Sequence, residues 1–173
     1  HAGIAAHDRR GLGSAGFRVD HDLTAGQSLT VQGDIHDGSS RHTGTEISLA
    51  DLTSDPIDYR IALKGHNLLA RWRRAVSPTE EWSLQFYYDH YERDYFNLRE
   101  RRETFDLDFN HHFLWGERQT IVWGGGYRNT TDDMDGTAIV AFDPDRRRDE
   151  TFSAFIQDEI ALRDDLYLTA GSK

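Results

Sequence analysis

The chain has 173 residues and a formal net charge of -10 at pH 7. This acidic balance argues against a nucleic-acid-binding protein, which needs a basic surface to displace counterions from phosphates. Cysteine is absent, which excludes disulfide bonds and thiolate metal sites. The sequence contains no run of about eighteen apolar residues, so it predicts no transmembrane helix. A membrane-spanning barrel stays open, because its strands carry a polar residue at every second position.

Alternation of apolar and polar residues predicts about eight β-strands and hardly any helix. In chain order the predicted strands cover residues about 14–23, 28–36, 65–76, 81–95, 102–115, 119–131, 148–162 and from about 165 onward. The strands are expected to follow one another as an antiparallel up-and-down meander, which makes the fold class all-β.

The fourth and fifth strands show the alternation most clearly. Within each strand the large apolar residues have the same parity, so their side chains share one face. We therefore expect one membrane-facing surface to contain Trp82, Leu84, Phe86, Phe105, Leu107 and Phe109. The opposite face carries residues such as Asp89, Asp106 and Asp108, which suit a water-filled lumen.

The predicted connections alternate in length. Short turns join the strands of each successive pair, whereas the longer connections cover about 37–63 and about 133–147, with a modest one at about 93–100. All the short connections then lie at one end of the sheet. Short turns at one end and long loops at the other are typical of outer-membrane barrels.

Strand length and aromatic residues favour the same interpretation. Several predicted strands have about twelve residues or more, whereas a tilted membrane strand needs roughly 9 to 11. All four tryptophans lie near the short turns, and Tyr88, Tyr91, Tyr95 and Phe96 lie toward the other end. This arrangement predicts two aromatic belts. Periodicity alone also fits a water-soluble sandwich or a lipocalin-like barrel with its apolar face turned inward.

Four segments resemble consecutive hairpins of one known family. They are "GFRVDHDLTAGQSLTVQGDIHDG", "NLLARWRRAVSPTEEWSLQFYYDHYERD", "ETFDLDFNHHFLWGERQTIVWGGGYR" and "FSAFIQDEIALRDDLYLTAGSK". The resemblance is to the barrel of TonB-dependent outer-membrane receptors and covers nearly the whole chain. It implies that residues 1–173 are an internal segment of a larger transmembrane β-barrel, with the plug domain and the remaining strands outside this sequence.

The resemblance implies a function in transport. The expected ligand is a ferric siderophore or another nutrient chelate, and the expected partners are the TonB complex, through the plug region, and outer-membrane lipid. The expected location is the outer membrane of a Gram-negative bacterium. No enzymatic activity, catalytic residue, cofactor or metal site is expected. The alternative is a small free-standing eight-stranded barrel, either an outer-membrane structural protein or a soluble carrier of an apolar ligand.

Ligand specificity is expected in the two longest predicted connections, because binding residues concentrate on loops held by a rigid frame. Guanidinium groups bind carboxylate and catecholate oxygens with two hydrogen bonds at once. The candidate ligand-binding residues are Arg41, Arg60, Arg146, Arg147 and Arg148. The alternative role for these arginines is to neutralise nearby acids such as Asp149 and Glu150.

Three other patterns predict little. The acidic stretch "TDDMDG" lacks the first and last ligands of a calcium loop. His111 and His112 are adjacent on a strand, so they point to opposite faces and cannot bind one ion together. A Ser/His/Asp triad of a hydrolase could be composed of Ser83, His112 and Asp108, but nothing in the sequence fixes the geometry of these residues.

Overall fold

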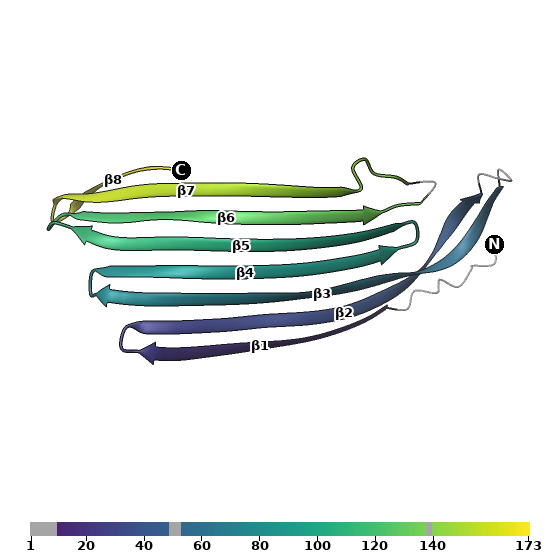
Figure 1. The fold of residues 1–173 in the computed structure, drawn as a ribbon, viewed down its shortest axis with the longest axis horizontal. Coiled ribbons are helices and arrows are strands. Elements are labelled where there is room, and N and C mark those ends of the chain that lie inside the picture. Colours follow the sequence, from purple (N-terminus) through teal and green to yellow (C-terminus); the bar gives the residue numbers. More distant parts are fainter. Residues whose placement is uncertain (1–9, 49–52, 138–139) are drawn as a thin grey trace.

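The computed structural model describes residues 10–48, 53–137 and 140–173. They form eight β-strands: β1 (Arg10–Thr24), β2 (Gln27–Ser48), β3 (Thr53–Ser77), β4 (Glu80–Tyr95), β5 (Leu98–Trp115), β6 (Gln119–Asp135), β7 (Arg146–Arg163) and β8 (Leu166–Ser172). Figure 1 shows them side by side in chain order. Every neighbouring pair is antiparallel, which confirms the predicted all-β meander. Within the described residues there is no helix long and apolar enough to cross a membrane.

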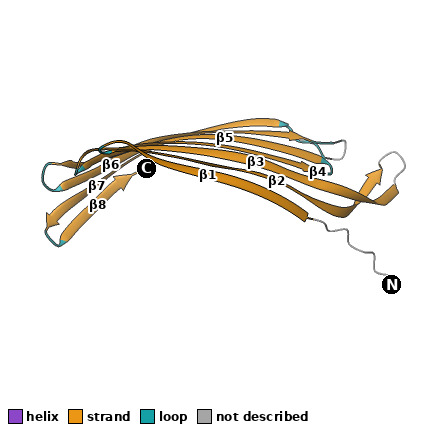
Figure 2. Cartoon of the chain, turned by 90° about the horizontal axis from the view of Figure 1, so that it is seen from below, coloured by secondary structure: helices purple, strands orange, loops and turns teal. Residues whose placement is uncertain are grey.

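The sheet is open and arched (Figure 2). Its strand order runs from β1 to β8, and no pairing between these two edge strands occurs in the described part of the chain. A free-standing eight-stranded barrel requires that pairing. The structure therefore gives the alternative of a small closed barrel no support.

Tight turns join the strands at one end of the sheet. Gly26 and Gly116 occupy these turns with φ of 83° and 68°, a region that glycine adopts without steric cost. We call this end the short-turn end. The other end differs from the sequence prediction, because the strands continue through most of what the sequence predicts as loops.

The longest predicted loop, residues 37–63, is mostly strand. β2 continues to Ser48 and β3 begins at Thr53. The β1–β2 pairing stops at Arg10–Ser40 and the β3–β4 pairing begins at Ala62–Asp94, so, among the described residues, 41–48 and 53–61 pair only with each other. Figure 1 shows this projecting ribbon extending beyond the rest of the sheet. Residues 49–52 lie outside the described part.

The predicted modest connection and the second predicted long connection are also shorter than expected. Only Phe96 and Asn97 separate β4 from β5. β6 ends at Asp135, and β7 begins at Arg146. The predicted alternation of short and long connections is therefore wrong at β4–β5. The difference between the two ends of the sheet lies mainly in the projecting ribbon.

One face of the sheet is apolar across seven strands. Residues directly opposite each other in a ladder share a face. A single row across the sheet contains Val19, Val31, Ala70, Phe86, Leu107, Tyr127 and Phe152. The rings of Phe86 and Phe105 are 5.1 Å apart, and those of Tyr127 and Phe152 are 4.8 Å apart. The register places the six residues predicted to share a surface on this apolar face.

The aromatic belts are confirmed at one end only. All four tryptophans lie on the apolar face near the short-turn end, where the rings of Trp72 and Trp82 are 4.6 Å apart. Of the second predicted belt, Tyr88 lies on the apolar face, but Tyr91 and Tyr95 have the opposite parity and lie on the polar face. The prediction missed this because it grouped residues by position along the strand and ignored parity.

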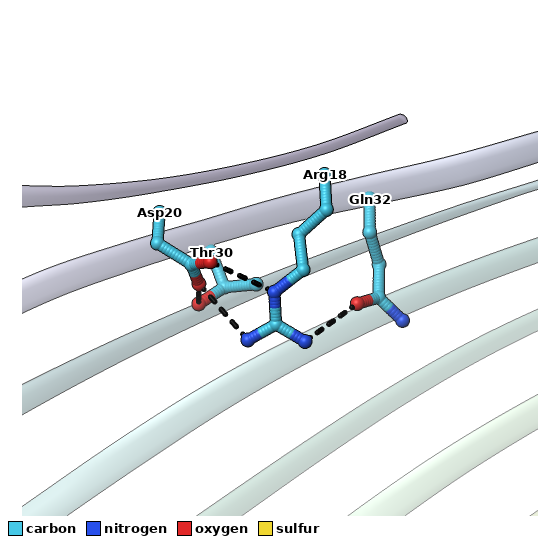
Figure 3. A network of polar contacts seen from close by, with 4 residues as sticks. All are labelled: Arg18, Asp20, Thr30 and Gln32. Carbon is cyan, nitrogen blue, oxygen red and sulfur yellow. Dashed lines mark hydrogen bonds and ion pairs between the residues drawn. The ribbon is translucent and has the colours of Figure 1, made fainter. Parts of the chain in front are cut away.

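The other face, the polar face, is covered by hydrogen-bonded side chains. Figure 3 shows Arg18 binding Asp20 and Gln32, with Thr30 donating to Asp20 over 2.6 Å. Arg128 donates to Asp106 over 2.6 Å. Since the described residues form one layer, Ile121 is their only buried apolar side chain, and Phe152 remains 76% exposed. The apolar face therefore needs a cover that these residues do not supply.

Candidate ligand-binding site

The candidate site is a hollow on the polar face, near the base of the projecting ribbon. Its volume is about 660 Å³, and residues from β1 to β4 line it. One cross-strand row through it contains Leu12, Gly38, Leu63 and Arg93. We call this site the rim hollow.

Glycines at and beside the hollow make room for side chains of the neighbouring strands. A Cβ atom at Gly38 would lie 2.9 Å from Leu12 Cδ1, and one at Gly65, in the next row, would lie 2.5 Å from the His36 ring. Leu12 and His36 therefore lie close over these two glycines on the polar face. The taller side chains of Tyr91 and Arg93 on β4 form one wall.

Two arginines of the hollow have no acidic partner. Within the described ranges, neither Arg10 nor Arg93 makes an ion pair. The Arg93 guanidinium lies over the Tyr95 ring, 5.4 Å from its centre. Glu100, opposite Arg93 in the ladder, lines a smaller neighbouring hollow of about 230 Å³ together with Arg93 and Tyr95. The rim hollow thus offers positively charged donors that are free to bind an anion.

An aromatic cluster adjoins the hollow. The rings of His42 and Tyr59 stack at 5.9 Å, and Tyr59 contacts Tyr95 at 5.4 Å and Phe96 at 5.3 Å. The Tyr59 and Tyr95 hydroxyl oxygens are 3.0 Å apart. This hydrogen bond raises the pKa of Tyr59 above its usual value. The cluster joins the projecting ribbon to the β4–β5 turn.

The five arginines predicted as ligand-binding residues do not form one cluster. Arg41 and Arg60 lie directly opposite each other in the projecting ribbon, and Arg41 also borders the rim hollow. Arg146, Arg147 and Arg148 begin β7, on the far side of β4, β5 and β6.

Two of the β7 arginines take the alternative role of neutralising nearby acids. Arg147 is 3.0 Å from Asp149, and Arg148 is 2.7 Å from Glu150. Arg146 lies opposite Asp133 in the ladder, beyond ion-pair distance of it.

Apart from Arg41, the sequence predictions did not include the residues of the rim hollow and of the adjoining aromatic cluster. Arg10, His42, Tyr59, Arg93 and Tyr95 come from four different strands, and only the register brings them together. On β4, Arg93 and Tyr95 are separated from Ser83 and Gln85 by an even number of positions, so the sequence alone could have placed them on the polar face. The residues that lie beside them on neighbouring strands could not be predicted from the parity of one strand.

The weaker sequence patterns gain no support. No three His, Asp or Glu side chains gather as a metal site in the ranges that the structure describes. Within the acidic stretch, Asp132 pairs with Arg102, and Asp133 lies 4.0 Å from Arg101. His111 and His112 lie on opposite faces, as expected. Ser83, Asp108 and His112 lie in three different rows of the polar face.

Comparison with known proteins identifies the fold. A family model described as "TonB dependent receptor-like, beta-barrel" matches residues 3–173. A search of curated proteins finds no match. Proteins of this family are receptors and transporters in the outer membrane of Gram-negative bacteria, and the apolar face and long strands are consistent with that location. The chain therefore belongs to the TonB-dependent receptor β-barrel family.

Proposed function

We propose that the eight strands form part of the wall of a larger outer-membrane barrel that imports a ferric siderophore or a similar anionic nutrient chelate. The open edges of the sheet support a larger barrel. The edges of β1 and β8 offer unpaired backbone groups to further strands, and unpaired edges invite association. Further strands and a plug that contacts the TonB complex then belong to the complete receptor.

The rim hollow is the proposed ligand contact within this chain. The observation that carries the proposal is the presence, on the polar face of the rim, of two guanidinium groups, Arg10 and Arg93, that have no acidic partner among the described residues. Such groups bind the carboxylate or catecholate oxygens of a chelate in bidentate fashion. The adjoining rings of His42, Tyr59 and Tyr95 offer flat apolar surfaces for the organic part of the ligand.

Of the five arginines predicted from the sequence, Arg41 fits this proposal best, because it borders the rim hollow, although it shares the parity of the apolar face with Arg60 opposite it. Arg147 has the parity of the polar face but is paired with Asp149. Arg60, Arg146 and Arg148 have the parity of the apolar face and do not border the hollow, so we propose no ligand contact for them.

Binding measurements on the complete receptor test this proposal. The Kd for an anionic ferric chelate is measured by tryptophan fluorescence for Arg10→Ala and Arg93→Ala. A hydrogen bond to a charged group contributes about 1.5–3 kcal/mol, so each change should weaken binding roughly tenfold or more. TonB-dependent uptake of radioactive iron should fall in parallel.

Arg18→Ala is the matched control, because Arg18 also lies on the polar face of β1 but is 2.8 Å from Asp20. Its Kd should stay at the wild-type value. Unchanged affinity in both Arg10→Ala and Arg93→Ala, with the barrel still heat-modifiable on a gel, would remove the rim hollow from the binding site.

A further inference from the structure

A second group of cations lies on the polar face, at the end opposite the rim hollow. Arg71 and Arg73 are on β3 toward the short-turn end, two residues apart and therefore on the same face. Their Cα atoms are about 7 Å apart, since each residue of a strand spans about 3.4 Å. We call these two residues the arginine pair.

Other arginines of the polar face are neutralised within the sheet. Each of four binds a carboxylate, in the pairs Arg18–Asp20, Arg102–Asp132, Arg128–Asp106 and Arg147–Asp149. In the first and last of these pairs the acid follows two residues after the arginine, on the same face. Arg73 takes that position relative to Arg71. The chain thus has a second positive charge at a position where it elsewhere has an acid.

The arginine pair has no carboxylate partner in the described part of the chain. Arg71 Nε donates to the amide oxygen of Gln85 over 2.8 Å, and Arg73 makes neither a hydrogen bond nor an ion pair among the described residues. Gln85 is neutral, so both positive charges remain. Like charges held this close repel each other. An anion bound between the two guanidinium groups would remove that repulsion.

Neutral hydrogen-bonding side chains flank the arginine pair. Thr30 and Gln85 lie on either side of its first member in the ladder, and Ser28 and Ser83 lie on either side of the second. The Thr30 hydroxyl donates to Asp20, whereas the Gln85 amide nitrogen and both serine hydroxyls donate to no group among the described residues. These three donors can bind the oxygens of an anion without adding negative charge.

A hollow beside Arg73 leaves room for a ligand. Its volume is about 490 Å³, and the β1–β2 turn and the adjoining ends of β1, β2, β3 and β4 line it. Two carboxylates, those of Asp22 and Glu81, also line it, and neither makes an ion pair within the described ranges. Their negative charges weaken the binding of an anion at the arginine pair. Weak binding suits a site on a transport path, because the ligand must leave it again.

We propose that the arginine pair is a second anion-binding site, which holds carboxylate or catecholate oxygens of the imported chelate after it leaves the rim hollow. Guanidinium groups at both ends of the polar face let the ligand exchange one set of charged hydrogen bonds for another. Paired arginines between the two ends, such as Arg128 with Asp106, offer no such site. This inference rests on the proposed transport function, in which the short turns lie at the periplasmic end of the lumen.

The test measures the charge preference of reagents at a cysteine beside the arginine pair. Ser83→Cys places it opposite Arg73 in the ladder, and the 173 residues contain no other cysteine. The complete receptor, with any cysteine elsewhere replaced by serine, is purified in detergent at low ionic strength. It reacts separately with two methanethiosulfonate reagents, a sulfonate and a trimethylammonium, and each rate is divided by the rate with a free thiol. We expect the sulfonate to react faster, and citrate to slow its reaction by competition.

Variants assign this preference to the arginine pair. Arg73→Gln in the Ser83→Cys background should lower it about four- to ninefold, because one unit charge about 7 Å away in water changes the local concentration of each reagent about two- to threefold, in opposite directions. Thr151→Cys is the matched control, since Thr151 also lies opposite an arginine, but that residue, Arg128, is 2.6 Å from Asp106. Its cysteine should show no preference and no effect of Arg73→Gln.

Transport by Arg73→Gln connects the site to the proposed function. Arg73 makes no bond among the described residues, so the variant should fold normally and stay heat-modifiable on a gel. Radioactive iron is supplied as ferric citrate or as a ferric tris-catecholate, whichever the wild type takes up. The rate of TonB-dependent uptake at saturating concentration should fall, while the Kd measured by tryptophan fluorescence should stay at the wild-type value.

Three results would overturn the inference. Equal rates of the two reagents with Ser83→Cys would show that the pair attracts no anion. Reaction with neither reagent, while Thr151→Cys reacts, would show that another segment of the receptor covers the pair. An unchanged uptake rate in Arg73→Gln would remove the pair from the transport path. The reagent measurement does not involve the rim hollow, so a clear preference together with a wild-type Kd in Arg10→Ala and Arg93→Ala would contradict the proposed rim site alone.

Discussion

The middle of the sheet and the projecting ribbon are the same kind of antiparallel ladder, but different forces hold their side chains. In the middle, one face is apolar from Val19 to Phe152, with only lipid proposed to cover it. In the ribbon, Arg41 lies opposite Arg60 on one face and His42 lies opposite Tyr59 on the other, so neither face is apolar. The environment outside the chain stabilises the middle, whereas side-chain contacts within the chain stabilise the ribbon.

The largest expected effect tests the claim that lipid covers the middle. Leu84→Arg places a charge on the apolar face, opposite Phe109 and between the rows of Trp82 and Phe86. A charge on the lipid side of a barrel costs about 2–4 kcal/mol near the bilayer midplane. The free energy of unfolding, measured by guanidinium titration of the complete barrel in phospholipid vesicles, should fall by that amount.

Ser83→Arg is the control for this prediction, because Ser83 is the neighbouring residue on the polar face. A water-filled lumen should accept the added charge at less than about 1 kcal/mol, as surface substitutions usually cost little. Equal destabilisation by the two changes would mean that both faces of β4 are dry.

The middle of the sheet was predictable because its environment imposes a period of two. Under the proposed membrane placement, each of Phe105, Leu107 and Phe109 faces lipid, and each of Asp106 and Asp108 faces away from it. One sequence therefore contains enough information to give the parity of the strand. The strand assignments at β4, β5 and β6 agree with the structure for this reason.

The ribbon and the rim hollow were not predictable in the same way. Residues 38–46 are small or polar at nearly every position, so they show no period and the sequence predicts a loop there. The ladder there depends on backbone hydrogen bonds, which any residue except proline can make. The hollow depends on the register between β1, β2, β3 and β4, a non-local property that a single strand does not contain.

A second prediction concerns the close approach of strands on the polar face of the middle. Gly124 lies between Asn110 and Phe155, and an added Cβ would overlap the Phe109 carbonyl oxygen and lie 2.7 Å from the Phe155 ring. Overpacking of this kind typically costs about 1–3 kcal/mol. Gly124→Ala should lower the free energy of unfolding by about that amount in the same titration.

The next residue supplies the comparison. Gly125 faces the apolar side, where an added Cβ would meet only the Ser153 carbonyl oxygen, at 3.3 Å. We expect Gly125→Ala to change stability by less than Gly124→Ala, and to have little effect on the barrel's mobility on a gel. The reverse order of the two effects would contradict the assignment of the faces at β6.

The smallest expected effect concerns the ribbon. Tyr59 is its link to the β4–β5 turn, through the hydroxyl contact of 3.0 Å with Tyr95 and ring contacts with Tyr95 and Phe96. Tyr59→Phe removes only the hydrogen bond, whose net contribution is about 0.5–1.5 kcal/mol. Local opening of the ribbon should therefore become up to about tenfold more frequent, while the global stability should hardly change.

Hydrogen exchange distinguishes this local effect from a global one. Amides of residues 53–61 should exchange faster in Tyr59→Phe, and amides of β5 should not, because opening free energies vary from one part of a structure to another. Tyr127→Phe is the control, since its hydroxyl also makes a bond of 3.0 Å, to Glu150, but lies outside the ribbon. Wild-type exchange of residues 53–61 in Tyr59→Phe would show that the backbone ladder alone holds the ribbon. The rim would then be stabilised without its side-chain contacts, and the difference between the two regions would be one of environment only.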